Sequence, residues 1–141
     1  MAGFITTDGA DYLMSLFTGT EAILSEYYIA LVTETVGTAQ SGETILEPGG
    51  DYTRIPITIG PDAWTVAYGT ATNTVLVTLP VPAMEDWTGI IGWAICDSVT
   101  GGRVLYAGDY EEFDVAVGDE TFLPAGSISL TIDLAGWREI T

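Results

Sequence analysis

The sequence predicts an all-β domain: an antiparallel β-sandwich of about seven or eight short strands with one short N-terminal helix. Three observations lead to this prediction. Segments in which every second residue is apolar recur at intervals of roughly ten residues. Glycine-rich turns separate these segments, and 17 of the 141 residues are glycine. Helical periodicity is confined to a stretch near the N-terminus, whereas βαβ units would need helices between the strands.

The helix is expected over residues 7–19. Leu13, Met14 and Phe17 lie at helical spacing in this stretch, threonine and aspartate come at its start, and a glycine follows its last apolar residue. Residues 1–19 are therefore predicted to form an N-terminal arm and helix that precede the sandwich.

The first two strands are expected on either side of a long loop. Residues 27–32 are apolar at odd and at even positions alike, which is typical of a strand that is covered on both faces. Residues 38–51 are rich in Gly, Ser, Thr and Glu and predict an exposed loop. The run 54–59 then places isoleucine at every second position. Pro56 within this run indicates an edge strand or a bulge, because proline cannot donate to a strand ladder.

Apolar alternation predicts the remaining strands. The turn 97–102 separates two of them, which are therefore expected to form a hairpin. We expect one domain, residues 1–141, with the β-sandwich at 27–134 and a C-terminal tail at 135–141. The strands predicted after the long loop and the run 54–59 lie at 75–79, 91–96, 104–106, 113–117 and 128–134.

Charge and the length of the apolar stretches argue against two classes of partner, nucleic acid and membrane. Twenty Asp and Glu residues stand against three Arg, with no Lys, which gives a net charge of −17. Nucleic acid is not an expected partner, because binding it requires cations that neutralise phosphates. A membrane is not expected either, because no apolar stretch has the length of a signal peptide or a span. The acidity favours neutral or basic neighbours, and an acid-rich proteome would explain it equally well.

Residue types argue against catalysis. The chain has no histidine and no lysine, and Cys96 is its sole cysteine. The commonest general base, the Ser-His and Cys-His nucleophiles, Schiff-base lysines and thiolate metal clusters are therefore missing. We expect no enzyme, no catalytic residue, no cofactor and no metal. The acidic run 109–114 contains the residue type of glycosidases and calcium sites, but such clustering arises by chance among twenty acids.

A series of motifs follows the chain in a distinctive order. Tyr-Ile-Ala-Leu-Val-Thr at 28–33 comes after the helix, and the acidic loop ends in Tyr-x-Arg at 52–54. Further motifs are Asn73, Pro82-Ala83, Trp-Thr-Gly-Ile at 87–90, the most specific segment at 93–102, Val-Leu-Tyr-Ala-Gly at 104–108, Gly118-Asp119 and the closing segment 125–132. This order, over about residues 13–133, resembles a family of small β-sandwich proteins of tailed bacteriophages and prophages, labelled tail-fibre or virion-associated proteins. The chain departs from the family at Cys96, where a bulky apolar residue is usual.

The resemblance implies a non-enzymatic structural subunit of a tailed-phage virion, made in the bacterial host cytoplasm and exposed on the particle. It leaves open whether the subunit is a capsid decoration (cement) protein or a tail or fibre component. The alternative is a receptor- or glycan-binding module of the phage tail, for which exposed aromatic residues flanked by carboxylates would be the signature. The expected partners are other virion proteins, either major capsid or tail proteins. A homo-oligomer is expected from this role, with a trimer favoured.

Contacts between subunits are expected at residues that the sandwich does not use. These are the segment 2–17 and the loop 38–51, although the helix has a second interpretation as a lid over one end of the core. Trp93 lies on an apolar stripe and is expected in the core, whereas tryptophans near loops suit interfaces. The candidate interface residues are Phe4, Ile5, Leu13, Met14, Phe17, Glu43, Glu47, Trp64, Trp87, Tyr110 and Trp137, and the family-motif turn is marked by Asp97, Gly101 and Gly102.

Overall fold

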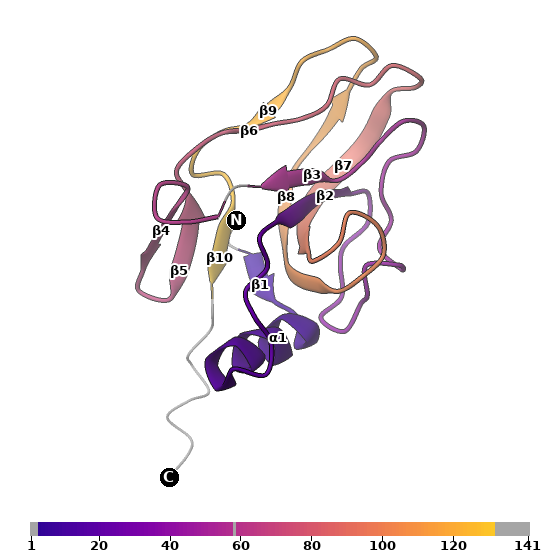
Figure 1. The fold of residues 1–141 in the computed structure, drawn as a ribbon. Coiled ribbons are helices and arrows are strands. Elements are labelled where there is room, and N and C mark those ends of the chain that lie inside the picture. Colours follow the sequence, from indigo (N-terminus) through magenta and orange to yellow (C-terminus); the bar gives the residue numbers. More distant parts are fainter. Residues whose placement is uncertain (1–2, 58, 132–141) are drawn as a thin grey trace.

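The computed structural model describes residues 3–57 and 59–131 of the protein. These residues form an all-β structure with one short helix, α1 (Thr7–Thr18), as shown in Figure 1. The predicted fold class is confirmed. The strands of the described residues are β1 (Gly3–Ile5), β2 (Tyr27–Val32), β3 (Ile55–Ile57), β4 (Trp64–Ala67), β5 (Thr70–Asn73), β6 (Val77–Thr78), β7 (Trp87–Cys96), β8 (Val104–Val115), β9 (Phe122–Leu123) and β10 (Ser129–Thr131).

Most of the strands belong to one large curled sheet. Its order is β3-β2-β7-β8-β1-β10-β5-β4, and β6 pairs with β9 in a separate two-stranded sheet (Figure 1). The neighbours are antiparallel except β1 and β10, which run parallel and differ in this from the expected antiparallel arrangement. This parallel pair was not predicted, because the three residues of β1 carry too little periodic signal. It places the N-terminal strand beside the last described strand.

The main hydrophobic core lies on one face of the curled sheet. Trp93 of β7 and Leu31 of β2 are each 1% exposed there, as the sequence predicts for Trp93. The alternate residues of the same strands, among them Ala30 and Ala94, point to the other face and form a second cluster. Ile45 covers that cluster and is only 6% exposed. The loop 38–51, expected to be exposed and uncommitted to the sandwich, therefore packs over the second face of the sheet.

Helix α1 confirms the expected helix at residues 7–19. Thr6 caps its start, and Gly19 ends it in the left-handed conformation with φ 76°. Gly9 allows the helix to approach β8 closely, because a Cβ at this position would lie 1.9 Å from the carbonyl oxygen of Leu105. In Figure 1 the helix lies across one end of the curled sheet.

The edge strand and the hairpin are also found where the sequence placed them. Pro56 lies in β3 at the edge of the large sheet, paired with Tyr28. β7 and β8 form the expected hairpin, but both are longer than expected. β8 joins the segments 104–106 and 113–117 into one strand that ends at Val115, because pairing with β7 carries it through polar residues that show no apolar alternation.

One hairpin was not predicted from the sequence. β4 and β5 pair across Tyr68 and Gly69, whose φ angles of 53° and 75° match a two-residue primed turn. Their residues are mostly threonine and alanine, so no apolar stripe marks them. The expected strand at 128–134 is described only as far as β10, and the tail 135–141 lies outside the described residues. Within the described part of the chain, no helix has the length and apolar character needed to cross a membrane.

Candidate functional site

Arg54, the last residue of the Tyr-x-Arg motif, is buried between the long loop and the β7–β8 turn. Its side chain is 3% exposed, and Nε and Nη2 donate to the two carboxylate oxygens of Glu47 at 2.9 and 3.1 Å. Nη1 donates to the carbonyl oxygens of Ser98 and Gly101 at 2.9 and 2.8 Å, and Nη2 also donates to that of Gly42 at 2.7 Å. These bonds use all five N–H groups of the guanidinium.

Tyr52 of the same motif shares the carboxylate with Arg54. Its hydroxyl donates to Oε1 of Glu47 at 2.9 Å and accepts the backbone N–H of Leu31 at 2.9 Å. Its ring meets the indole of Trp87 edge-on, with centroids 5.4 Å apart. Burial raises the pKa of Tyr52, and the charge of Glu47 adds to this effect. The motif thus connects the loop, β2 and the core.

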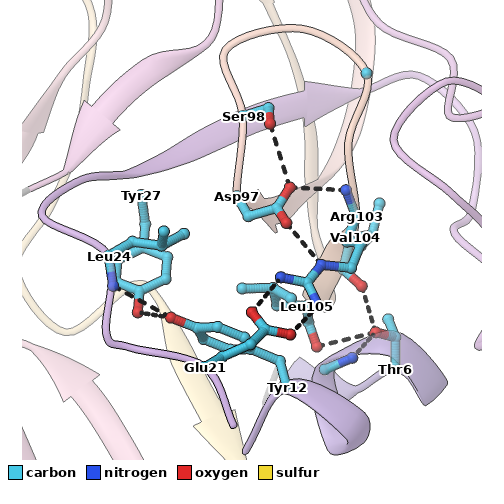
Figure 2. A network of polar contacts seen from close by, with 12 residues as sticks. Thr6, Tyr12, Glu21, Leu24, Tyr27, Asp97, Ser98, Arg103, Val104 and Leu105 are labelled. Carbon is cyan, nitrogen blue, oxygen red and sulfur yellow. Dashed lines mark hydrogen bonds and ion pairs between the residues drawn. The ribbon is translucent and has the colours of Figure 1, made fainter. Parts of the chain in front are cut away.

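Arg103 also binds the β7–β8 turn, through Asp97, as Figure 2 shows. Its Nε and its backbone N–H donate to the two carboxylate oxygens of Asp97 at 2.7 and 2.8 Å. Nη1 and Nη2 donate to the two oxygens of Glu21, each at 3.0 Å, and the guanidinium lies 5.1 Å from the ring centroid of Tyr12. The hydrogen bond from Arg103 lowers the pKa of Glu21. The segment that follows α1 is therefore tied to the turn.

Further hydrogen bonds hold α1 against the sheet. The hydroxyls of Tyr12 and Tyr27 lie 2.7 Å apart, and Tyr12 also accepts the backbone N–H of Leu24 at 3.3 Å. Thr6 is 1% exposed, and its hydroxyl hydrogen-bonds to the carbonyl oxygens of Val104 and of Leu105 (Figure 2). The start and the middle of the helix are thereby fixed in place.

The three residues that mark the family-motif turn have structural tasks in this arrangement. Asp97 binds Arg103, and the carbonyl of Gly101 binds Arg54. Gly101 and Gly102 have φ angles of 59° and 71°, a conformation that L side chains rarely adopt. The most specific motif of the sequence therefore forms the joint between both arginine networks.

An apolar groove of about 170 Å³ runs beside α1. It opens between the helix and the sheet, with lining residues from β2, β3, β4, β7, β8 and β10. The lining includes Tyr12, Leu13, Leu16, Ile59, Trp64 and Leu130. The sequence singles out Leu13 and Trp64 among them. Leu16 follows Leu13 at helical spacing and could have been added on that ground.

The chain matches the family model described as Podophage GP4 fiber I protein gp80 over residues 4–131. The chain belongs to this family of phage fibre proteins. The match includes both arginine networks, the groove and the β7–β8 turn. The resemblance to virion proteins of tailed phages is thereby confirmed. No curated protein matches the chain.

The described surface of this phage fibre family member is strongly acidic. Its two described arginines are paired with acids, Arg54 with Glu47 and Arg103 with Glu21 and Asp97. The third arginine, at position 138, lies outside the described residues, and the chain contains no lysine. The described part of the fibre protein therefore offers no unpaired basic side chain to a partner, and most of its acids face solvent.

Three of the candidate interface residues are exposed together on α1. Leu13, Met14 and Phe17 are 39%, 59% and 87% exposed on the outward side of α1. Phe4 and Ile5 are half-buried in β1, between β8 and β10, so they belong to the sheet of the fibre protein and not to a free arm. The expectation of an N-terminal arm is therefore wrong for residues 3–5, which form strand β1.

Other candidates lie apart from this face. The expectation that Trp87 lies at an interface near a loop is wrong. Trp87 is the first residue of β7 and is 1% exposed in the core. Tyr110 is half-buried against Phe113, with ring centroids 5.6 Å apart. Glu47 is bound to Arg54, and Glu43 is exposed. Trp137 lies outside the described residues.

The acidic run 109–114 does not form a compact cluster. Asp109, Glu111 and Glu112 are exposed, and Asp114 accepts the backbone N–H of Gly89 at 2.8 Å. Among the residues that the structure describes, no group of three or more His, Cys, Asp or Glu side chains is arranged to hold a metal ion.

Proposed function

We propose that the protein is a non-enzymatic structural subunit of a phage fibre, exposed on the virion and in contact with other virion proteins. Membership of a fibre protein family carries this proposal. The same membership favours the fibre over a capsid decoration protein, because the family description names a fibre and no capsid component.

The polar residues support a structural role. The ionised groups that the fold brings together, Arg54 with Glu47 and Arg103 with Glu21 and Asp97, bind one another and backbone carbonyls. They fix loops to the sheet, and all five N–H groups of Arg54 are already bonded within its network. The outward charge of the described surface is negative, which suits a layer that stays soluble and does not bind the packaged genome.

The three aromatic residues expected at a receptor- or glycan-binding site give less support to such a module. Stacking on a sugar ring requires an open aromatic face. Trp87 is buried, and Trp64 and Tyr110 are half-buried against neighbouring residues, so none of the three presents a free ring. We therefore make the fibre subunit our proposal.

Cryo-electron microscopy of purified virions, combined with antibodies against the full chain on intact particles, tests this proposal. We expect density of this fold in a fibre, and antibody bound there. Density over the capsid lattice would replace the fibre role by decoration, and absence from the particle would overturn both. Release of reducing ends from host surface polysaccharide by the purified protein would overturn the non-enzymatic part.

A further inference from the structure

Helix α1 exposes three large apolar side chains on its outward side, alongside the exposed Asp11. Gly9 and Tyr12 face the sheet and are buried, whereas Leu13, Met14 and Phe17 are 39%, 59% and 87% exposed. A surface helix normally turns mainly polar residues to solvent, and a contiguous group of exposed apolar residues marks an interaction site. The described chain leaves this outward face open to solvent, so an additional surface is needed to bury it.

The groove beside the helix has the size of an aromatic ring. Its volume is about 170 Å³, and its walls include Leu13 on the helix and Trp64 and Leu130 on the sheet. An apolar cavity of roughly 150 Å³ holds a benzene molecule. Phe17 has the most exposed phenyl ring of the described chain and, at 87% exposed, does not fill the groove of its own copy.

Charge indicates which partner can cover this face. Residues 12–25 contain one charged group, Glu21, and Arg103 binds it. None of the residues that line the groove is charged. A basic partner would gain most from the acidic parts of the surface. A copy with the same net charge of −17 is repelled least where the facing surfaces are uncharged, as the lining of the groove is.

We propose that a second copy of this chain docks on the outward face of α1, with Phe17 of one copy inserted into the groove of the other. This inference deepens the proposed function and rests on it, because it treats the chain as an assembly subunit. The face is already rigid: Thr6 and Tyr12 fix α1 to the sheet. Docking therefore orders few groups and loses little entropy. Exchange of Phe17 side chains between two copies forms a dimer, and head-to-tail insertion forms a closed ring.

Sedimentation velocity of the full chain at micromolar concentration tests this inference. We expect the wild-type protein to associate into a dimer or a ring such as a trimer. Phe17→Ser is expected to weaken association roughly 30-fold or more, as truncation of a central aromatic residue does. The matched control is Phe122→Ser, which removes a 55% exposed phenylalanine on β9, far from α1 in Figure 1. This control is expected to associate like the wild type.

The dependence of association on ionic strength is an independent test. Screening of like charges is expected to strengthen association of the wild-type protein as ionic strength rises. A wild-type monomer would overturn the inference, as would association that Phe17→Ser leaves unchanged while circular dichroism shows both variants folded. A monomer that is nevertheless found in the fibre would leave the proposed function standing. An oligomer that is absent from virions would overturn the proposed function, but not the contact itself.

Discussion

Arg54 and Glu47 form a two-point ion pair inside the protein, with N···O distances of 2.9 and 3.1 Å. The side chain of Arg54 is 3% exposed and that of Glu47 is 19% exposed. Burial disfavours the charge on the guanidinium, but the hydrogen bonds from Arg54 to Glu47 hold the pKa of Arg54 above its ordinary value. Because the guanidinium also binds the carbonyls of Ser98 and Gly101, one side chain joins the long loop to the β7–β8 turn.

The first prediction concerns this pair. Arg54→Met leaves Glu47 without its cation and three backbone carbonyls without their donor. We expect the free energy of unfolding to fall by about 3–5 kcal/mol, as it does when one partner of a buried pair is removed. Arg54→Lys is expected to recover little of this loss, because an ammonium lacks the planar fork of five donors. Urea denaturation followed by tryptophan fluorescence measures both changes.

Glu43→Gln is the matched control for this prediction. Glu43 is an exposed acid of the same loop, and its substitution is expected to change the free energy of unfolding by less than about 0.5 kcal/mol. A loss of less than roughly 1 kcal/mol in Arg54→Met would show that other contacts hold the loop against the sheet.

The second prediction concerns the contact between α1 and β8. Alanine in place of glycine stabilises an exposed helix by about 1 kcal/mol. At Gly9 the added methyl would lie 1.9 Å from the carbonyl oxygen of Leu105, so the helix must move. Overpacking of this kind costs about 1–3 kcal/mol. We expect Gly9→Ala to lower the melting temperature. Ala10→Gly, at an exposed position of the same helix, calibrates the propensity effect, and a more stable Gly9→Ala would contradict the packing.

The third prediction is a loss of stability in alkali. Burial raises the pKa of Tyr52, of Tyr27 and of Tyr106. In the unfolded chain these hydroxyls ionise near pH 10. The native state keeps protons that the unfolded state releases, so their contribution is complete below pH ~10 and is lost progressively as the pH rises above it. Urea denaturation between about pH 8 and pH 11 measures this decline.

Tyr52→Phe separates this effect from general alkaline unfolding. The variant is less stable at neutral pH because it loses the hydrogen bonds to Glu47 and Leu31. Its stability is nevertheless expected to decline less steeply with pH than that of the wild type, because one raised pKa is gone. Parallel declines would show that Tyr52 ionises as easily in the folded protein as in the unfolded one.

The sequence predicts those parts of the fold whose residues follow one period over several positions. α1, β2 and the β7–β8 hairpin are of this kind, and Pro56 marks its edge strand because it has no N–H. β1 and the β4–β5 hairpin are too short, or too poor in large apolar residues, to show a period. Trp87 was misplaced because glycines interrupt the alternation between it and the apolar run that follows.

The candidate site could likewise be predicted only in part from the sequence. The outward apolar residues of α1 could be identified because local helical spacing determines their position. The arginine networks could not be predicted in full, because each joins near and distant partners. Glu47 and Asp97 lie 7 and 6 positions from their arginines, whereas Ser98 and Glu21 lie 44 and 82 positions away. Ser98 and Glu21 reach these arginines only in the folded sheet, and the spacing of residues in a motif does not predict such contacts.

The last prediction concerns Cys96, which is 0% exposed in the second cluster. Burial raises the pKa of its thiol to about 12. Because the thiolate is the reactive form, the native protein is expected to resist a disulfide reagent at about pH 8, and the urea-unfolded protein to react fully. Absorbance of the released thiol measures both. Arg54→Met is expected to react faster than the wild type, because the loop over Cys96 opens more often. Wild-type protein that reacts as fast as Arg54→Met would show that Arg54 does not hold this cover closed.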